Sequence, residues 1–255
     1  MTFDVASEVY ERHVGRYGPS LSAAHTAAAA VEPGQRVLDV GCGPGPLTQV
    51  LAGIVGEGSV AAVDPSPSFV DACRERLPEA EVRLGQAEEL PFADGEFDIA
   101  LSQLVVNFMA DPQAGVRELR RVVRPGGTVS SCVWDYADGM EMLRAFWDAA
   151  LELDPDAPDE GRVMRFCREG ELAHLWESCG LTEVEDGELW AVADYESFDD
   201  YWEPFTSGLA PSGAYCASLD DDRREALYEA CFRRLGSPPA PFTLRARAWY
   251  AVGRA

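Results

Sequence analysis

The chain has 255 residues, a length that fits one large domain or a domain with an inserted lid. Its formal net charge of −23 would repel a phosphate backbone, so we expect no nucleic-acid partner. The N-terminal residues MTFDVASEVYERHV have neither the basic start nor the apolar core of a signal peptide, and the run Ala27–Val31 is too short to span a bilayer. These features predict a cytoplasmic protein without a membrane partner.

The first half of the chain alternates predicted strands and helices. Arg36–Val40 is a short apolar run typical of a buried strand, and Leu47–Ile54 carries apolar residues at the spacing of one helix face. The alternation continues with predicted strands at Val60–Val63, Glu81–Leu84, Phe97–Ser102 and Thr128–Val133, and with predicted helices at Pro67–Leu77 and Val116–Val123. Such alternation predicts a parallel, doubly wound sheet with helices on both faces.

The second half is richer in aromatic and acidic residues. Leu181–Tyr195 and Phe242–Val252 are predicted strands. Helices are predicted at Met140–Leu153, around Leu172–Cys179, after a possible N-cap at Ser197, and over the amphipathic stretch LDDDRREALYEACFRRLG. We expect N-terminal cap helices over residues 1–30, a core over 31–135, a lid over 136–240 interleaved with a core helix (169–179) and strand (181–195), and a final strand over 241–255.

Seven cysteines are scattered along the chain, and none is spaced Cys-x-x-Cys. An odd, scattered set argues against a disulfide framework and against a zinc ribbon. We therefore expect small, buried, unpaired cysteines and no metal site.

The segment Val37–Thr48, VLDVGCGPGPLT, places a glycine-rich turn directly after a strand. Glycine lets the backbone approach a ligand closely, and ligands bind at the carboxyl edge of such sheets. The dinucleotide pattern G-x-G-x-x-G would need its third glycine one residue after Gly45. Asp39, just before the turn, is also a poor neighbour for a pyrophosphate. The sequence therefore favours a nucleoside ligand without phosphate.

Four blocks together resemble one family. Asp39–Gly45 resembles motif I, D/E-x-G-x-G-x-G, of class I S-adenosylmethionine (SAM)-dependent methyltransferases of the small-molecule type. The end of the second strand (Val63–Phe69), the segment GQAEELPFADGEFDIALSQLVV and the segment RELRRVVRPGGTV resemble further family blocks in the same order. The resemblance implies an α/β, doubly wound, mostly parallel seven-stranded sheet of the Rossmann-like methyltransferase type, with a helical lid inserted in the C-terminal half. It also implies in-line methyl transfer from SAM, with S-adenosylhomocysteine (SAH) as product.

The resemblance also implies how the chain would bind the adenosine part of SAM. Asp64 would accept hydrogen bonds from both ribose hydroxyls, although an acid before Pro65 can also simply start a helix. Phe69 and the loop at Pro65 would flank adenine, but Phe69 could equally be core. The adenine edge would meet three consecutive residues, Gln86, Ala87 and Glu88. Gln86 stands where the family usually has Asp, and Glu88 could instead be an exposed helix acid.

The methionine part of SAM would pass the turn itself. The backbone of Gly41, Cys42 and Gly43 would line it, and Asp39 would order the loop and favour the ammonium group. Ser102 and Gln103, at the end of the fourth strand, would meet the same portion. The piece before the sheet offers three candidates for the cofactor carboxylate, or else a plain surface helix: Tyr10, Arg16 and Tyr17.

The acceptor is expected beyond the ends of strands four and five. Candidate contacts there are Asn107, Trp134 and Tyr136, under a roof, or an ordinary lid core, of Phe146, Trp147, Tyr201, Trp202 and Phe205. Ser102–Val105 departs from the D/N-P-P-Y/F pattern of nucleic-acid amino methylases, so a small, partly apolar acceptor is favoured. No general base is assigned, because a lone histidine is more often structural.

Two alternatives remain open. A non-catalytic SAM- or SAH-binding protein would show the same cofactor site. A nicotinamide-dependent oxidoreductase is disfavoured by the glycine spacing and by the lack of any lysine for a Tyr-x-x-x-Lys motif. The oligomeric state, monomer or homodimer, stays open.

Overall fold

The computed structural model describes residues 12–255, and the chain divides into two compact units. Of the described residues, unit 1 contains 12–18, Asp135–Met164 and Trp190–Arg247. Unit 2 contains Pro19–Trp134, Arg165–Leu189 and Ala248–Ala255. Neither unit is a single stretch of chain: the expected lid, residues 136–240, belongs mostly to unit 1, but its residues 165–189 belong to unit 2.

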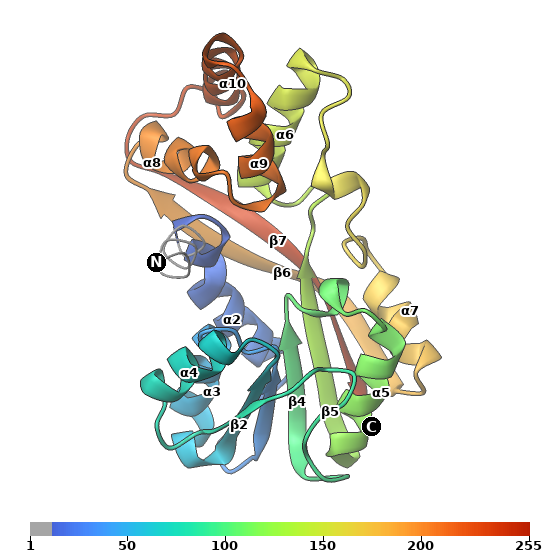
Figure 1. The fold of residues 1–255 in the computed structure, drawn as a ribbon. Helices are drawn as coiled ribbons and strands as arrows, with labels where there is room; N and C mark the ends of the chain where they lie inside the picture. The colour runs from blue at the N-terminus through green and yellow to red at the C-terminus, as the bar shows by residue number, and fades with distance from the viewer. Residues whose placement is uncertain (1–11) are drawn as a thin grey trace. The chain divides into compact units, whose positions relative to one another are not determined.

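The strands form one seven-stranded sheet in the order β3-β2-β1-β4-β5-β7-β6 (Figure 1). They are β1 (Val37–Val40), β2 (Val60–Asp64), β3 (Glu81–Leu84), β4 (Phe97–Gln103), β5 (Val123–Trp134), β6 (Thr182–Tyr195) and β7 (Phe242–Arg254). The first five strands pair in parallel, and β7 runs antiparallel to β5. The sheet is therefore mixed and has the predicted α/β methyltransferase topology.

Unit 2 buries the central strands between helices. Every residue of β1 and β2 is buried, as the continuous apolar runs predicted. Five α-helices belong mainly to this unit: α2 (Gly18–Ala28), α3 (Pro46–Val55), α4 (Pro67–Arg76), α5 (Pro112–Val122) and α7 (Glu171–Ser178). Short 3₁₀ turns, η2 (Glu57–Ser59) and η3 (Val106–Phe108), complete the connections. Asp111 caps α5 by accepting a hydrogen bond from the Ala114 N–H, and an apolar stripe on α5 faces the core.

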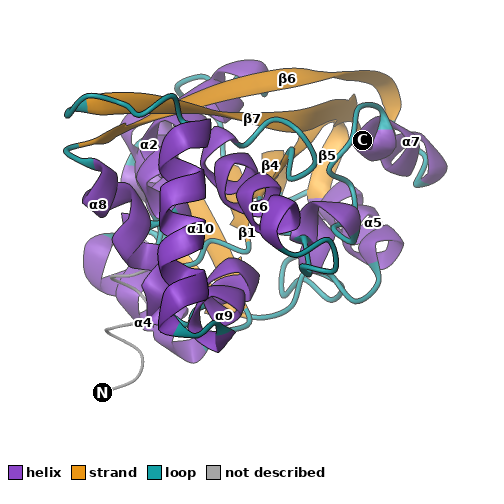
Figure 2. Ribbon diagram, turned by 90° about the horizontal axis from the view of Figure 1, so that it is seen from above, coloured by secondary structure: helices purple, strands orange, loops and turns teal. Residues whose placement is uncertain are grey.

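Unit 1 is mainly helical around an aromatic core. Its elements are η1 (Val14–Tyr17), α6 (Glu141–Leu153), η4 (Glu160–Arg162), α8 (Phe198–Trp202), η5 (Glu203–Ser207), α9 (Ala210–Ser218) and α10 (Asp221–Arg234). Figure 2 shows α10 beside α6, and the ring of Phe146 stacks on Phe205 with centroids 4.4 Å apart. Ser197 caps α8 as predicted, because its side chain accepts a hydrogen bond from the Asp200 N–H.

The helix α10 confirms the predicted charge pattern. Two acids lie in its first turn and two arginines in its last, which matches the helix dipole. All seven cysteines are free and buried, as predicted. Within residues 12–255, no helix is both long enough and apolar enough to cross a membrane.

Candidate cofactor site

The turn after β1 depends on glycine at three positions. Gly41, Gly43 and Gly45 have φ of +76°, +53° and +97°, values that other residues rarely adopt. A Cβ on Gly41 would lie 2.4 Å from the side chain of Val105, and one on Gly45 would lie 3.0 Å from Cys73 Sγ. A Cβ on Gly43 would meet no atom within 4 Å. The turn therefore packs against protein at both ends and presents bare backbone to open space at its centre.

Backbone hydrogen bonds fix this turn to the next strand. The N–H groups of Gly41 and Cys42 both donate to the carbonyl of Val63 on β2, at 2.8 and 3.1 Å. The Gly45 N–H donates back to the Cys42 carbonyl at 3.0 Å and closes the turn. Because Val63 immediately precedes Asp64, the glycine turn and the strand-end acid are held together.

Asp64 contacts the turn directly. The acid is 6% exposed, and its Oδ2 accepts a hydrogen bond from the Gly43 N–H at 2.9 Å. Its Oδ1 accepts from the Ser66 N–H at 2.8 Å. A carboxylate has about four acceptor positions, so capacity remains for two hydroxyl groups. The structure therefore brings together Asp64 and Gly43, as the sequence predicted.

Asp39 lies on β1, two residues before the turn starts at Gly41, and is 1% exposed. Its Oδ2 accepts a hydrogen bond of 2.7 Å from the hydroxyl of Thr48, in the first turn of α3. Burial raises the pKa of the Asp39 carboxyl to about 7, the Thr48 hydrogen bond opposes this rise, and the neighbouring Asp64 carboxylate adds to it. Sequence reasoning did not identify Thr48.

The residues 86–88, which follow β3 after Gly85, lie in a turn rather than a helix. Gln86 and Glu89 form an isolated antiparallel β-bridge through their backbones. Gln86 is exposed, and Ala87 is partly buried. Glu88 accepts hydrogen bonds from the N–H groups of Ala110 and Asp111 at 2.9 and 3.3 Å, so the helix alternative for Glu88 was wrong. This acid braces the start of α5. Its proposed contact with adenine, like those of Gln86 and Ala87, stays a prediction.

Residues around adenine and at the end of β4 differ in burial. Pro65 is exposed and Phe69 is partly buried on α4. Ser102 is fully buried on β4, and Gln103 Nε2 donates to the Ser22 hydroxyl on α2 at 2.9 Å. In the described part of the chain, Ser102 Oγ and Gln103 Oε1 have no hydrogen-bond partner. The contact from α2 was missed, although Ser22 and His25 lie three residues apart on one helix face.

Two of the three N-terminal candidates, Arg16 and Tyr17, lie in unit 1. Tyr10 falls outside the described residues. Arg16 binds both Asp200 oxygens, at 3.0 and 3.1 Å, and its guanidinium lies 4.3 Å from the centre of the Tyr195 ring. Tyr17 is fully buried, with its hydroxyl 3.1 Å from that of Tyr195. These contacts hold both side chains within unit 1, and their role with the cofactor carboxylate stays a prediction.

The acceptor candidates divide between the units. In unit 2, Asn107 and Trp134 are buried, and Arg165 Nη2 donates to the carbonyl of Asn107 at 3.1 Å. In unit 1, Tyr136 is 9% exposed, and the predicted roof is a packed aromatic cluster of Phe146, Trp147, Tyr201, Trp202 and Phe205. Trp147 Nε1 donates to Glu160 at 3.1 Å. This packing favours the alternative that the cluster is ordinary core.

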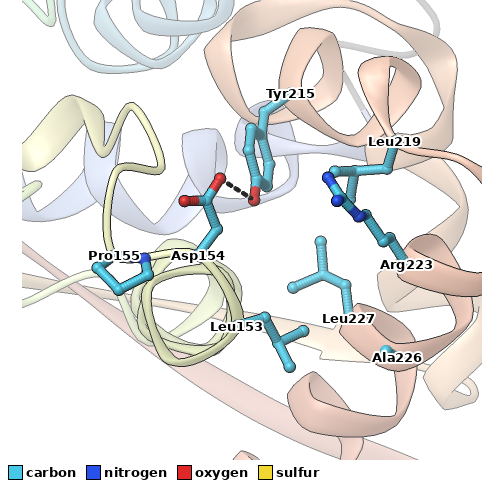
Figure 3. Close-up of a pocket in the computed structure, with 8 residues that line it drawn as sticks. All are labelled: Leu153, Asp154, Pro155, Tyr215, Leu219, Arg223, Ala226 and Leu227. Atoms are coloured by element: carbon cyan, nitrogen blue, oxygen red, sulfur yellow. Dashed lines mark hydrogen bonds between the residues drawn. The ribbon is translucent and has the colours of Figure 1, made fainter.

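Unit 1 also contains a cavity of about 370 Å³ that sequence reasoning missed (Figure 3). It lies between the end of α6, α9 and the first half of α10. Figure 3 shows Leu153 and Leu227 below Tyr215, with Asp154 and Arg223 to either side. The Tyr215 hydroxyl donates to Asp154 Oδ2 at 3.5 Å. The cavity therefore combines an apolar floor with groups of opposite charge.

Comparison with known proteins assigns the core of unit 2. Residues 38–131 match the family model described as a methyltransferase domain. This stretch is a class I SAM-dependent methyltransferase domain. The methyltransferase domain thus begins within β1, includes the glycine turn and Asp64, and ends within β5. SAM is the cofactor that this family implies, and SAH the product.

Several known proteins resemble about half of the chain. An uncharacterized methyltransferase of Schizosaccharomyces pombe is 36% identical over 149 residues, which are 51% of this chain and 53% of that protein. An uncharacterized methyltransferase of Mycobacterium tuberculosis H37Rv is 38% identical over 139 residues, 54% of each protein. The chain spans about half the length of these curated relatives.

A solved structure covers more of the chain. It is a putative methyltransferase from an antibiotic biosynthesis pathway of Anabaena variabilis, which matches with a TM-score of 0.62 over 91% of this chain and 98% of that one. Their sequences are 20% identical, so this likeness supports the fold alone.

The methyltransferase domain has a geometry that fits SAM. Bare backbone at Gly43 faces open space, and a carboxylate with spare acceptor positions lies beside it. A second acid, Asp39, lies on the adjacent strand and suits a cationic rather than a phosphorylated ligand.

Proposed function

We propose that the chain transfers a methyl group from SAM to a small, partly apolar acceptor by direct in-line displacement, leaving SAH. The observation that carries the proposal is the Asp64 carboxylate, held at 2.9 Å by the N–H of Gly43 in the glycine turn. This arrangement joins a hydroxyl-accepting group to a backbone that a ligand can approach closely.

The residues of the site would bind and align SAM. Asp64 accepts from the two ribose hydroxyls, the backbone at Gly43 passes the methionine portion, and Asp39 attracts its ammonium group. The sulfonium of SAM supplies an activated methyl group. The chain then needs to hold the acceptor atom in line with that methyl group and to exclude water.

Two features of the sequence support a small acceptor. The net charge of −23 disfavours nucleic acid, and Ser102–Val105 lacks the motif of nucleic-acid amino methylases.

Cofactor binding tests the first half of this proposal. Isothermal titration of the full chain should show binding of SAM and SAH and none of NAD. Asp64→Ala should weaken SAH binding at least about tenfold, since it removes charged hydrogen bonds to the ligand. Asp71→Ala, which removes an acid that is 71% exposed on α4, should leave affinity unchanged. Binding of NAD in place of SAH, or an Asp64→Ala variant with full affinity, would contradict the proposal.

Methyl transfer tests the second half. The full chain is incubated with isotope-labelled SAM and a fractionated metabolite extract. The label should appear in a small molecule of the extract, in a fraction that dissolves in organic solvent. SAH binding without any labelled product would instead support the non-catalytic alternative.

A further inference from the structure

A line of buried side chains lies beneath the glycine turn. The Thr48 hydroxyl donates to Asp39 Oδ2 at 2.7 Å, and Cys73 Sγ donates to Thr48 Oγ1 at 3.8 Å. Thr48 and Cys73 are fully buried, and Asp39 is 1% exposed. The line connects α4, the start of α3 and β1, directly under the turn that would pass the methionine portion of SAM.

The surroundings of Asp39 disfavour its ionised form. The carboxyl is buried, and a second carboxylate, Asp64, approaches from β2. The other titratable groups that face it are two thiols, Cys42 in the turn and Cys73 on α4. The Thr48 hydroxyl favours the ionised form, because it donates a hydrogen bond to a carboxylate oxygen.

Thr48 is well suited to orient this carboxylate. It lies in the first turn of α3, immediately after the turn closed by Gly45, so its backbone is fixed by the helix. A β-branched side chain also has few rotamers, and burial removes the remaining freedom. The hydroxyl is therefore held toward β1 at little further entropic cost.

We propose that Thr48 is a positioning residue of the cofactor site, whose hydroxyl holds Asp39 in the orientation and ionised state that receive the ammonium group of SAM. The inference rests on the proposed function, since it needs a methionine portion above the turn. It goes beyond that function by assigning a role to a residue that does not touch the cofactor.

A pair of ligands separates this role from a structural one. SAH carries the ammonium group, whereas 5′-methylthioadenosine has the same nucleoside without the amino-acid portion. Thr48→Val keeps the shape of the side chain and removes the donor. It should weaken SAH binding about tenfold, the size of one charge-assisted hydrogen bond, and leave methylthioadenosine binding unchanged. Thr48→Ser should restore SAH affinity.

The pH dependence of binding gives a second readout. Ionised Asp39 attracts the ammonium group, so wild-type affinity for SAH should rise as pH increases through about 7. Thr48→Val removes a group that favours ionisation, so the midpoint should move to higher pH. Asp39→Asn should abolish this dependence.

The controls distinguish the possible failures. Thr26→Val makes the same change in a buried threonine of α2, whose hydroxyl bonds to its own helix at Ala23, and should alter neither ligand's affinity. Equal weakening of SAH and methylthioadenosine by Thr48→Val, or no weakening of either, would overturn the positioning role. Absence of SAH binding by the wild type would instead overturn the proposed function.

Discussion

Val105 occupies the space that a side chain on Gly41 would need. A Cβ on Gly41 would lie 2.4 Å from Val105 Cγ2. Gly41 starts the turn after β1, and Val105 follows Leu104, whose φ is +63°, after β4. Since β1 and β4 are neighbouring parallel strands, the two loops at their carboxyl ends interlock. The shape of the cofactor turn therefore depends on the loop that leads to the predicted acceptor contacts.

Gly41→Ala should destabilise the chain through both strain and this contact. The left-handed backbone costs about 1–2 kcal/mol for alanine, and the overlap with Val105 costs about 1–3 kcal/mol more. Val105→Ala in the same chain should relieve the overlap but not the strain. Urea unfolding of both single variants and the double variant measures the coupling. Purely additive losses would show that the two side chains do not meet.

Gly43→Ala should separate binding from stability. Its added Cβ would meet no protein atom within 4 Å. The free energy of unfolding should therefore fall only by the cost of a left-handed alanine, about 1–2 kcal/mol. The same methyl group would enter the space proposed for SAM, so SAH affinity should fall at least about tenfold. Gly53→Ala, inside α3 with open space around its added Cβ, is the matched control and should keep full affinity. Calorimetry measures the SAH affinity, and thermal melting the stability, of the wild type, Gly43→Ala and Gly53→Ala. Unchanged SAH affinity in Gly43→Ala would show that the ligand binds elsewhere.

His25 should make stability fall in mild acid. It is fully buried on α2, its Nε2 lies 2.9 Å from Ser130 Oγ, and burial lowers its pKa to about 4. The unfolded chain takes up the proton first, near pH 6.5, so stability is lost as pH falls from about 6.5 to about 4. Between about pH 7 and pH 5, the wild type should lose about 2 kcal/mol more than His25→Gln.

Chemical denaturation at the two pH values measures this difference. His174→Gln changes an exposed histidine on α7 and should follow the wild type. Equal losses in the wild type and His25→Gln would show that burial does not lower the pKa of His25 in the folded chain.

Arg16 and Asp200 should act as one unit in stabilising unit 1. The guanidinium binds both carboxylate oxygens, and the Arg16 side chain is 15% exposed. Arg16→Ala and Asp200→Ala should each cost about 1–2 kcal/mol, and the double variant should cost less than their sum. Arg12→Ala removes more exposed ion pairs, to Glu203 and to Asp200, and should cost less than about 1 kcal/mol. If the losses of the two single variants simply add in the double variant, as measured by chemical unfolding, Arg16 and Asp200 do not act as a pair.

The elements that follow simple periodicity could be predicted well from the sequence. β3 (Glu81–Leu84) has the predicted bounds, and α10 was recognised from its stripe and charged ends. The approach of Asp64 to the glycine turn also followed from sequence, because parallel strands bring their carboxyl ends to one edge.

Other parts depend on contacts between distant segments. The helix α9 (APSGAYCAS) contains proline, glycine and serines and lacks a clear apolar stripe, so it was missed. The strand β5 begins at Val123, five residues before the predicted start, although Pro125 and two glycines follow. Glu88 and Thr48 acquire their partners only through folding, and neither has a local pattern that identifies that partner.

The order of the strands has a consequence for synthesis of the chain. β7 is made after β6, yet it lies between β5 and β6 in the sheet. While the ribosome is still adding Phe242–Arg254, β6 has no neighbour to pair with and its backbone groups stay open to solvent or to other chains. Four acidic side chains lie on β6 from Glu183 to Glu188, and their charge would disfavour pairing of this unpaired strand with another copy of the chain.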